Sequence, residues 1–543
     1  MQINKIDGAI FKSMVIGGAE NLRNNYAEID KLNVFPVPDG DTGTNMKMTI
    51  EGGINEIYNV HELNVQEFSK KFSRGMLMGA RGNSGVILSQ IFRGVAKGLD
   101  GFEQADAIRL AHAFQVGVEM GYKAVMKPTE GTILTVAREA SEKMNAISSS
   151  RMSINEFFEE YLAEAKASLE RTPELLPVLK EAGVVDSGGA GYICILEGML
   201  SALNSDGETQ KPLAEHSHKE EKEGYCVELA IIPKDEKIDV NVLTSDLSKV
   251  GTEVALAKNE NIIKVHLDTK TPGIVLTLAQ KYGEFESVKV ESFKHEEHEI
   301  HHVAEGVCEC GEEHHAPVQK PKERKKYAIV TVASGAGLVK TFEDLGADYI
   351  VSGGQSMNPS TEDFIRGYDT LNAEHIFVLP NNKNIILAAN QSAKIYTESQ
   401  VHVIETKSIA QGFSALTMID LTADVDGVIN GVLDTISNVT TGLVTYSIRD
   451  TVLEGLEIKK DDFIGICDNK IVSSTRRKAD AVKLLLKEAV TDNKSLITII
   501  YGNDTTSKEV EELEKFINKN YSDLEVVVIE GNQEVYSYIL SIE

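Results

Sequence analysis

The sequence predicts a multidomain protein: an all-α helical barrel or bundle, a small α/β middle domain and an α/β C-terminal region. A chain of 543 residues is too long for a single hydrophobic core. Apolar residues follow helical spacing up to about residue 204, and strand patterns alternate with helical ones from about residue 327. The predicted parts are residues 1–204, a linker 205–224, a middle domain 225–300, a second linker 301–326 and residues 327–543.

The composition excludes several classes of protein. The chain carries 55 Lys and Arg against 83 Asp and Glu, a net charge of −28, which argues against nucleic acid and anionic membranes as partners. No apolar run approaches 18 residues and the first residues lack a signal-peptide core, so we expect no transmembrane segment and a cytoplasmic location. The five scattered cysteines do not suggest a disulfide framework.

The N-terminal region is predicted to consist of helices joined by glycine-rich loops. Residues 106–125 and 154–169 have clear helical spacing. Sites in helical bundles are commonly built at one end from such loops and the facing helices, so we expect the loops to carry chemistry. The rest of the region shows no convincing strand pattern.

The first loop, residues 33–46, holds two aspartates in a rigid turn. Two prolines exclude helix and two glycines allow unusual backbone angles around Asp39 and Asp41. Carboxylates with few other protein ligands suit Mg²⁺, which takes its remaining oxygens from water and substrate phosphates. The following residues, Thr42, Gly43, Thr44 and Asn45, offer N–H groups and hydroxyls before a helix. The alternative is a capped turn with an accidental Asp pair.

Three further loops interrupt helices at residues 78–85, 127–132 and 186–191. A single glycine-rich connection is usually only a turn, but four in one helical region favour a shared site. The sequence contains neither a P-loop motif nor a dinucleotide fingerprint after a strand, so the common nucleotide-binding folds are not indicated.

In the middle region we expect strands at residues 225–233, 262–268 and 287–293 and a helix at 240–257. Period-two alternation puts His266 and Asp268 on one face of their strand. A tract rich in His and Cys follows at residues 295–315. Its spacing matches no standard zinc finger and its composition indicates a linker.

The C-terminal region is predicted to be α/β. Its strand candidates are residues 327–333, 349–351, 375–379, 401–405, 442–448, 496–501 and 524–529. The loops at 353–360 and 379–384 follow strands, where sites on such sheets usually lie, although either loop could be a simple capped turn.

The four N-terminal loops carry a family resemblance. Asp-Gly-Asp-Thr-Gly-Thr-Asn-Met (39–46), Gly-Asn-Ser-Gly (82–85), Pro-Thr-Glu-Gly-Thr (128–132) and Asp-Ser-Gly-Gly-Ala-Gly (186–191) resemble, in this order, the L-type nucleotide domain of dihydroxyacetone kinases. With the preceding Asn-Val-Phe-Pro-Val-Pro (33–38), the stretch resembles the ATP-binding subunit of bacterial fatty-acid kinase. The two C-terminal loops resemble that family too, so the resemblance covers nearly the whole chain except the linkers.

The resemblance implies an eight-helix barrel that holds ATP through two Mg²⁺ ions. It makes Asp39 and Asp41 metal ligands, while Asn33 would have to stand in for a third ligand. We assign catalytic roles to Asp39, Asp41, Thr132 and Arg81. The expected nucleotide contacts are Thr42, Gly43, Thr44, Asn45, Asn83, Ser84, Gly85, Thr129, Gly131, Asp186, Gly188 and Gly189.

The resemblance also implies a structural Zn²⁺ in the middle domain. The matching positions are Cys226, His266, Asp268 and His298, with Asp268 standing where the family has a second His. Zinc accepts oxygen ligands as well as nitrogen and sulfur, so the site is expected to tolerate the change. A buried Cys and an ordinary strand His remain the alternative.

The expected function is ATP-dependent phosphorylation of a fatty-acid carboxylate, giving acyl phosphate and ADP. Exposing the methylene groups of a long chain to water costs about 0.8 kcal/mol each, roughly 10 kcal/mol in all, so a lipid-binding carrier protein is the expected partner. The C-terminal region is expected to engage this carrier, and a homodimer is left open. The alternatives are a kinase of the dihydroxyacetone type and a nucleotide-sensing regulator without catalysis.

Overall fold

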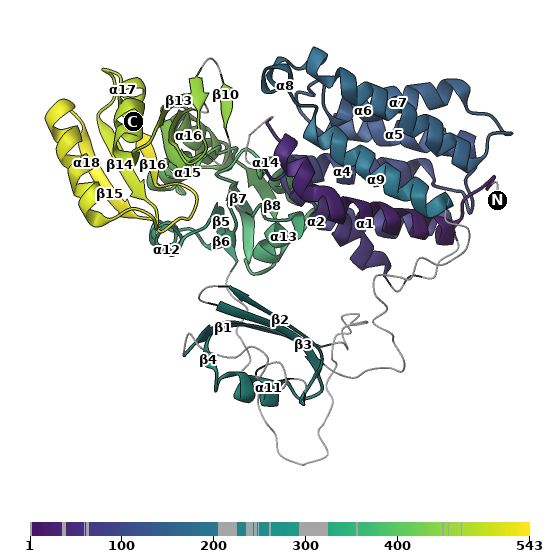
Figure 1. Ribbon diagram of the computed structural model, residues 1–543. Helices are drawn as coiled ribbons and strands as arrows, with labels where there is room; N and C mark the ends of the chain where they lie inside the picture. Colours follow the sequence, from purple (N-terminus) through teal and green to yellow (C-terminus); the bar gives the residue numbers. More distant parts are fainter. Residues whose placement is uncertain are drawn as a thin grey trace. The chain divides into compact units, whose positions relative to one another are not determined.

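The computed structural model describes residues 3–34, 40–58, 60, 64–204, 225–234, 243, 247, 249–259, 262–292, 324–354, 357–447, 450–453, 456–468 and 470–543. The chain divides into two compact units. The larger combines Met1–Glu208 with Lys320–Glu543, and the smaller is Thr209–Gln319. Each unit is described by itself (Figure 1).

The N-terminal part of the larger unit is all helical over its described residues, as predicted. Its helices are α1 (Gly8–Leu32), α2 (Thr42–Ile57), α3 (Val65–Met78), α4 (Gly82–Gly98), α5 (Ala107–Ala124), α6 (Ile133–Ile147), α7 (Ile154–Leu175), α8 (Pro177–Ala182) and α9 (Ser187–Asn204). They enclose a core of buried aliphatic and aromatic side chains, including a cluster of rings around Phe114 and Tyr161. The predicted helices at residues 106–125 and 154–169 are confirmed as α5 and α7.

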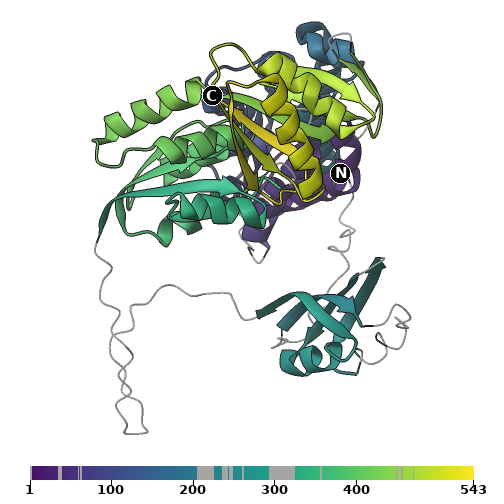
Figure 2. The ribbon, with the colours of Figure 1, turned by 90° about the vertical axis from the view of Figure 1, so that its left-hand side faces the viewer.

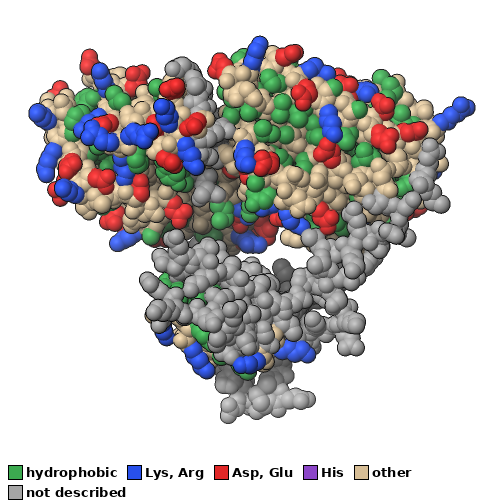
Figure 3. Space-filling model, in the orientation of Figure 1, with side chains coloured by type: hydrophobic (Ala, Val, Ile, Leu, Met, Phe, Trp, Pro, Cys, Tyr) green, Lys and Arg blue, Asp and Glu red, His purple; other side chains and the backbone are tan. Residues whose placement is uncertain are grey.

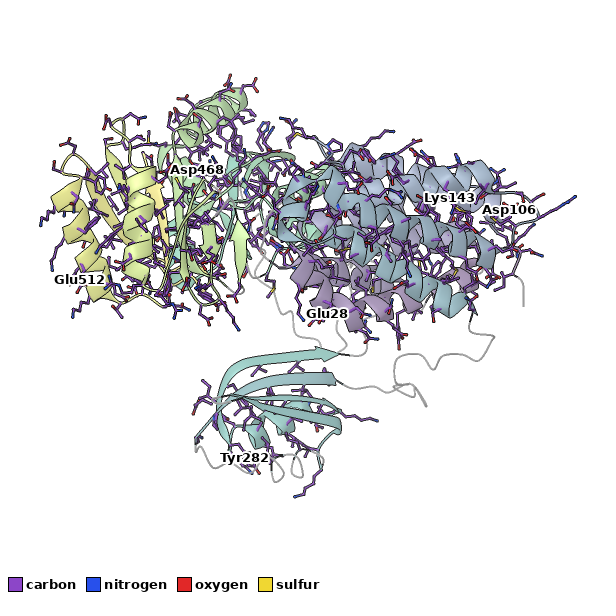
Figure 4. The ribbon with its side chains drawn as sticks, turned by 45° about the horizontal axis from the view of Figure 1, so that its top comes forward. Glu28, Asp106, Lys143, Tyr282, Asp468 and Glu512 are labelled. Atoms are coloured by element: carbon purple, nitrogen blue, oxygen red, sulfur yellow. The ribbon has the colours of Figure 1, made fainter. Side chains whose placement is uncertain are left out.

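Four of these helices begin at one end of the bundle. A backbone bridge joins Ile6 to Ala105, which places the starts of α1 and α5 together. The N–H of Val65 at the start of α3 donates to Glu103, and the N–H of Ile154 at the start of α7 donates to Ile3. Figure 4 labels Asp106, the residue that caps α5, at the end of the bundle away from the C-terminal region.

Two predicted loops are helical for part of their length. α4 begins at Gly82 and α9 at Ser187, so residues 82–85 and 187–191 form first helical turns instead of extended loops. Their glycines allow close helix packing: a Cβ on Gly85 would lie 2.2 Å from Thr49 Oγ1, and one on Gly191 would lie 2.6 Å from the sulfur of Met46. Glycine therefore serves helix contact at these positions.

The described C-terminal part of the larger unit contains two larger sheets with helices against their faces (Figure 2), besides a two-stranded sheet of β10 and β11. The first sheet is parallel, in the order β6-β5-β7-β8, and the second has the order β13-β12-β9-β16-β14-β15. The elements are β5 (Lys325–Ala333), α12 (Ala336–Asp344), β6 (Tyr349–Ser352), α13 (Thr361–Asp369), β7 (Ala373–Leu379), α14 (Ile386–Ile395), β8 (Gln400–Val403), α15 (Ile409–Met418), α16 (Val425–Ser437), β9 (Thr440–Tyr446), β10 (Thr451–Leu453), β11 (Leu456–Ile458), β12 (Phe463–Cys467), β13 (Lys470–Thr475), α17 (Lys478–Ala489), β14 (Leu496–Tyr501), α18 (Ser507–Asn520), β15 (Glu525–Glu530) and β16 (Tyr538–Ile542).

The helical part and the C-terminal part share a hydrophobic core. Ala80 and Val86, at the start of α4, are buried in one cluster with residues of β5, β7 and α14 such as Val330, Val378 and Ala388. A backbone bridge between Arg81 and Ser360 extends this contact. The sequence did not predict it, because the contacting residues are far apart in the chain and hydrophobic periodicity reports only local structure.

Over its described residues, the smaller unit contains an antiparallel sheet and the helix α11. Its elements are β1 (Tyr225–Pro233), β2 (Thr252–Asn259), β3 (Ile262–Thr269), α11 (Pro272–Ala279) and β4 (Gly283–Ser292), with the sheet order β2-β3-β1-β4. The predicted helix at 240–257 is wrong for residues 252–257, which belong to β2. Pairing with β3 decides the structure there, and only Leu243 and Leu247 of the preceding stretch are described as helical.

Acidic and basic side chains are interspersed over the visible face of the larger unit (Figure 3). Among the described residues, no helix combines the length and the apolar character needed to cross a bilayer.

Candidate functional site

A cavity of about 1370 Å³ lies in the larger unit, where the helical part meets the C-terminal part. Residues of all four predicted loops line it, together with residues of α14 and the segments before and after that helix. The predicted site residues on its wall are Asn33, Asp41, Thr42, Asn45, Asn83, Ser84, Thr129, Thr132, Asp186 and Gly188. The fold thus brings together residues that are about 150 positions apart in the sequence.

Four helices of the helical part begin at this cavity: α2, α4, α6 and α9. None of them has an acidic residue in its first turn. The N-cap residues of α2, α4 and α6, which are Asp41, Arg81 and Thr132, make no side-chain cap hydrogen bond. The first N–H groups of a helix have no partner within the helix and carry the positive end of its dipole. Such an arrangement suits an anion.

Carboxylates accept first-turn N–H groups at three of these helix starts. Asp30 Oδ1 accepts from the N–H of Thr44 in α2 over 3.1 Å, and the starts of α9 and α6 are bound by Asp186. Its Oδ2 accepts a hydrogen bond of 2.7 Å from the N–H of Gly189, and the N–H of Ile133 also donates to its carboxylate. One buried side chain thus ties the start of α9 to the start of α6. Burial raises the pKa of Asp186 to about 6, although the two N–H groups oppose this shift. Ser187 Oγ adds a bond of 3.1 Å to Thr42 Oγ1 of α2.

Asp41 is held from the C-terminal part. The Nδ2 of Asn358 donates to Asp41 Oδ2 over 2.6 Å and lies 3.5 Å from Asn45 Oδ1. Asn358 is 3% exposed, so this polar contact is well buried. Asn33 lines the same cavity. Asp39 lies outside the described residues, so its metal role stays a prediction.

Six predicted site residues do not line the cavity: Gly43, Thr44, Arg81, Gly85, Gly131 and Gly189. Thr44 is turned toward α1, where its Oγ1 donates to Asp30 Oδ2 over 2.7 Å. A Cβ on Gly43 would lie 2.3 Å from the carbonyl oxygen of Tyr26, so this glycine permits packing of α2 on α1. Gly131 has a φ of 80°, a conformation that glycine adopts readily.

Arg81 joins the two parts of the unit. Its Nη1 donates to the backbone oxygen of Asn358 over 2.7 Å and lies 3.3 Å from Asp363 Oδ2. The side chain is only 19% exposed. These contacts give Arg81 a role in holding Asn358 beside Asp41.

The cavity wall carries more basic than acidic side chains. The basic residues are Arg93, Lys97, Lys123, Lys127, Lys383, Lys394 and Lys407, and the acidic ones are Asp41, Asp186 and Glu405. None of the seven cations forms an ion pair with another residue that the structure describes. In a chain with a net charge of −28, such a cavity favours a polyanionic ligand.

Sequence reasoning did not identify these cations as site residues. Lys127 lies in the predicted loop 127–132, and the others come from helices or from the C-terminal part. Another relevant signal was the loop at 379–384, which was identified as a possible ligand loop because it follows a strand. Its Asn384 accepts a hydrogen bond of 2.9 Å from Asn83 Nδ2 in the first turn of α4.

The predicted zinc residues lie in the smaller unit. The strand register pairs Cys226 with Asp268 and Glu228 with His266, so the backbone puts these positions on one face of the sheet. Their side chains and the whole of His298 lie outside what the structure describes. No group of three or more His, Cys, Asp or Glu suited to a metal occurs in the described part of the chain. The zinc site stays a prediction.

Three family models match successive regions of the chain. Residues 36–201 match the DAK2 domain. Residues 222–300 match the FakA-like middle domain of fatty acid kinase, and residues 328–543 match the FakA-like C-terminal domain.

Two curated relatives align over their full length. Protein YloV of Bacillus subtilis is 41% identical over 563 residues, which covers 100% of both chains. The uncharacterized protein SAR1202 of Staphylococcus aureus is 42% identical over 559 residues, again covering 100% of both chains.

Solved structures give weaker matches. The Fak B3 protein of Streptococcus pneumoniae, loaded with linoleic acid, is 11% identical and matches 40% of this chain and 98% of its own, with a TM-score of 0.28. The dihydroxyacetone kinase of C. freundii with AMP-PNP and Mg²⁺ is 17% identical and matches 36% of this chain and 34% of its own, with a TM-score of 0.29. TM-scores this low do not establish a shared fold. The full-length relatives and the order of the three domain matches do, however, show that the chain belongs to the FakA-like family of fatty acid kinase proteins, with a DAK2 domain in its N-terminal part.

Proposed function

We propose that this protein is the ATP-binding subunit of a kinase that phosphorylates the carboxylate of a fatty acid carried by a separate lipid-binding protein. The observation that supports this most directly is the cavity: four helix starts and seven basic side chains surround a space large enough for a nucleotide. The proposal takes the acceptor from the family to which the chain belongs.

In this proposal the helix starts hold the phosphates. The first turns of α2, α4 and α9 offer N–H groups and the side chains of Thr42, Ser84 and Ser187. Apolar residues on another part of the wall, such as Ile87, Met120 and Leu134, offer a surface for the base. Arg81 acts as a positioning residue through Asn358, and Thr132 contacts substrate from the start of α6.

The oxygen donors beside the helix starts fit Mg²⁺. Asp41 and Asn33 line the cavity and Asp39 lies two residues from Asp41 in the sequence, and Mg²⁺ is usually bound by one or two carboxylates plus phosphate oxygens. When bound, the metal neutralises charge on the phosphates. Asn358 orients the carboxylate of Asp41 through its hydrogen bond.

The proposed reaction needs no general base. A carboxylate oxygen of the fatty acid forms a bond to the γ-phosphorus of ATP, the bond from that phosphorus to the β,γ-bridging oxygen breaks, and ADP leaves with that electron pair. A fatty-acid carboxylate is already ionised at neutral pH, so no proton has to be removed. The protein's part is positioning and electrostatic stabilisation.

A lipid-binding carrier is the proposed partner. The matching family is described as one component of fatty acid kinase, which implies at least one further component. A free long-chain fatty acid would expose roughly 10 kcal/mol of apolar surface to water, at about 0.8 kcal/mol per methylene. Delivery by a carrier avoids this cost.

The test is formation of acyl phosphate from ATP, Mg²⁺ and an acyl-loaded carrier. We expect turnover by the wild-type protein and a loss of at least about a hundredfold with Asp39→Ala plus Asp41→Ala, since both changes remove proposed metal ligands. Glu512→Ala, on the surface of α18, is the matched control for loss of an acidic residue. Unchanged turnover in the double variant would refute the metal assignment. Transfer to dihydroxyacetone with none to lipid would refute the acceptor.

A further inference from the structure

The loop at residues 380–385 is a rigid part of the cavity wall. It follows β7 at the carboxyl edge of the parallel sheet, where ligand sites on such sheets lie. Asn381 stands at its base with a φ of 58°, a conformation uncommon for a residue other than glycine. Backbone strain of this kind persists only where the surroundings impose it.

A buried hydrogen-bond network imposes this conformation. The Nδ2 of Asn381 donates to Thr331 Oγ1 over 2.8 Å and to the backbone oxygen of Val332 over 2.9 Å. Its Oδ1 accepts from Thr406 Oγ1 over 2.8 Å. Gly412 packs so closely that a Cβ there would lie 2.1 Å from Asn381 Oδ1. The network ties the loop after β7 to the segment after β8, which contains Thr406 and Lys407.

The other end of the loop is attached to the helical part. Asn384 N–H donates to Asn382 Oδ1, which shapes the turn, and Asn384 Oδ1 accepts from Asn83 Nδ2 of α4. Lys383 lies between these two fixed points and lines the cavity. The loop thus presents Lys383 next to a helix start that faces the same space.

Lys383 and Lys407 are two cations on this wall without an ion-pair partner among the described residues. Burial lowers the pKa of Lys383, and the nearby charge of Lys407 lowers it further, while Asp468 acts in the opposite direction. Two like charges that line the same cavity repel each other, and an anion bound between or beside them offsets that repulsion. The proposed function counts both lysines among the basic side chains of the cavity but assigns neither of them a contact.

We propose that Lys383 and Lys407, presented by the C-terminal part, bind an anionic oxygen group of the substrates in the same cavity as the helix starts. The inference rests on the proposed function for the identity of those substrates, which offer two such groups: the phosphates of ATP and the carboxylate of the acceptor. The kinase centre is then composite, and the DAK2 part alone lacks two of its cations.

The first experiment needs no fatty acid and no turnover. The full chain is treated with an amine-acylating reagent with and without inorganic tripolyphosphate, and modification of each lysine is measured by mass spectrometry. We expect tripolyphosphate to protect Lys383 and Lys407 and to leave Lys487, exposed on α17, unprotected. This result is independent of whether the acceptor is a lipid, so failure of the proposed function and failure of this inference are distinguishable.

The second experiment identifies the bound group. Calorimetry measures the affinity of Lys383→Met plus Lys407→Met for Mg-ATP, and kinetics measures its KM for the acyl-loaded carrier. A loss of affinity of about tenfold or more assigns the lysines to phosphate, while an unchanged ATP affinity with a similarly raised acceptor KM assigns them to the carboxylate.

Two further variants separate binding from structure. Lys383→Arg keeps the charge and should stay within about threefold of wild type, whereas a merely structural lysine gives no such charge dependence. Lys487→Met is the control for loss of an exposed lysine. Unchanged ATP affinity, acceptor KM and kcat in the double variant, or equal acylation of Lys383 with and without tripolyphosphate, would overturn the proposal.

Discussion

The two ends of the helical bundle differ in how their N-cap residues bond to the first turns of the helices. At the end formed by α1, α3, α5 and α7, each N-cap residue accepts a hydrogen bond from the first turn: Asp7, Asn64, Asp106 and Ser153. At the cavity end, the N-cap residues of α2, α4 and α6 make no such bond. A missing cap costs about 0.5–2 kcal/mol. Other carboxylates replace part of this capping, because Asp30 accepts from Thr44 N–H of α2 and Asp186 accepts from Ile133 N–H of α6, while the N-cap residue of α4 makes no such bond.

The difference favours the cavity end as the proposed nucleotide site. The capped end satisfies its N–H groups with side chains and is complete without a ligand. At the cavity end, the first-turn N–H groups that Asp30 and Asp186 do not accept face a space lined by cations, so a polyanion bound there would supply their acceptors. Changes at the two ends should accordingly affect different quantities: stability at the capped end and anion affinity at the cavity end.

The largest effect is expected when an acidic residue is added at the cavity end. Ser84→Asp places a carboxylate in the first turn of α4, where it favours the helix but repels phosphate. Even at an effective dielectric constant of about 20, two unit charges about 4 Å apart interact by about 4 kcal/mol. We expect affinity for Mg-ATP, measured by calorimetry, to fall at least about a hundredfold, with the thermal midpoint unchanged or raised.

The control places the same charge at the capped end. Ile108 is 46% exposed in the first turn of α5, so Ile108→Glu favours that helix in the same way. We expect ATP affinity within about twofold of wild type, because the new charge is at the opposite end of the bundle. Equal losses of ATP affinity in Ser84→Asp and Ile108→Glu would contradict the assigned difference between the two ends.

The next effect concerns the side chain that orients Asp41. Asn358→Ala removes the donor 2.6 Å from Asp41 Oδ2 but keeps the backbone oxygen that Arg81 contacts. Partners that orient metal ligands typically contribute about 10–100-fold to metal affinity or activity. We expect the Mg²⁺ concentration for half-maximal ATP binding to rise by about that factor. Asn438→Ala, at the exposed end of α16, should leave it unchanged.

The third prediction concerns Asp186, the buried carboxylate that accepts N–H groups from the starts of α9 and α6. Its folded pKa of about 6 lies above the value of about 4 for an unfolded chain, so the folded state binds this proton more tightly. The resulting stability is present at low pH and is lost as pH rises from about 4 through about 6. Asp186→Asn removes this titration.

Urea unfolding followed by circular dichroism from pH 4.5 to 7 tests the sign. Over that range wild type should lose about 1–3 kcal/mol more than Asp186→Asn, since each pKa unit corresponds to about 1.4 kcal/mol. Curves that stay parallel would mean that Asp186 has an ordinary pKa.

The sequence predicted this site only in part. Each of the four loops contains a helix start, and local residues such as Thr132 and Asp186 identify it. Successive long helices run in opposite directions, so every second long helix begins at the same end of the bundle and the four loops come together there. Which residues of a loop reach the cavity depends on packing: Thr44 turns toward Asp30 while Thr42 lines the wall. Sequence spacing does not contain that information.

The contribution of the C-terminal part could not be predicted for another reason. Asn358 and Asp41 are 317 positions apart, and their contact depends on how the helical part and the C-terminal part pack against each other. The same limit explains the error at residues 252–257, where helical spacing continued but pairing with β3 made a strand. Local periodicity identifies most elements, whereas partner choice is a tertiary property.

The smallest effects are expected when an N-cap residue is replaced by alanine at each end of the bundle. Ser153 caps α7 in a capping box: Glu156 N–H donates to Ser153 Oγ, and Ser153 N–H donates to Glu156. Ser153→Ala should cost about 1 kcal/mol of unfolding free energy, with ATP affinity unchanged. Thr132 makes no cap bond to α6, although its Oγ1 donates to the Thr129 oxygen. Thr132→Ala should cost less stability.

For ATP affinity the order is reversed: Thr132→Ala should lose more affinity than Ser153→Ala. Thr132 lines the cavity and is proposed to contact substrate, so its loss should weaken ATP binding by about three- to tenfold, the usual worth of one hydrogen bond of about 1 kcal/mol. Calorimetry and urea unfolding on both variants give a two-by-two comparison. If Thr132→Ala lost as much stability as Ser153→Ala and kept its ATP affinity, the helix starts at the cavity end would serve stability alone. The expected result is that Ser153→Ala lowers stability without changing ATP affinity, while Thr132→Ala mainly lowers ATP affinity. That result requires helix starts that bind a ligand.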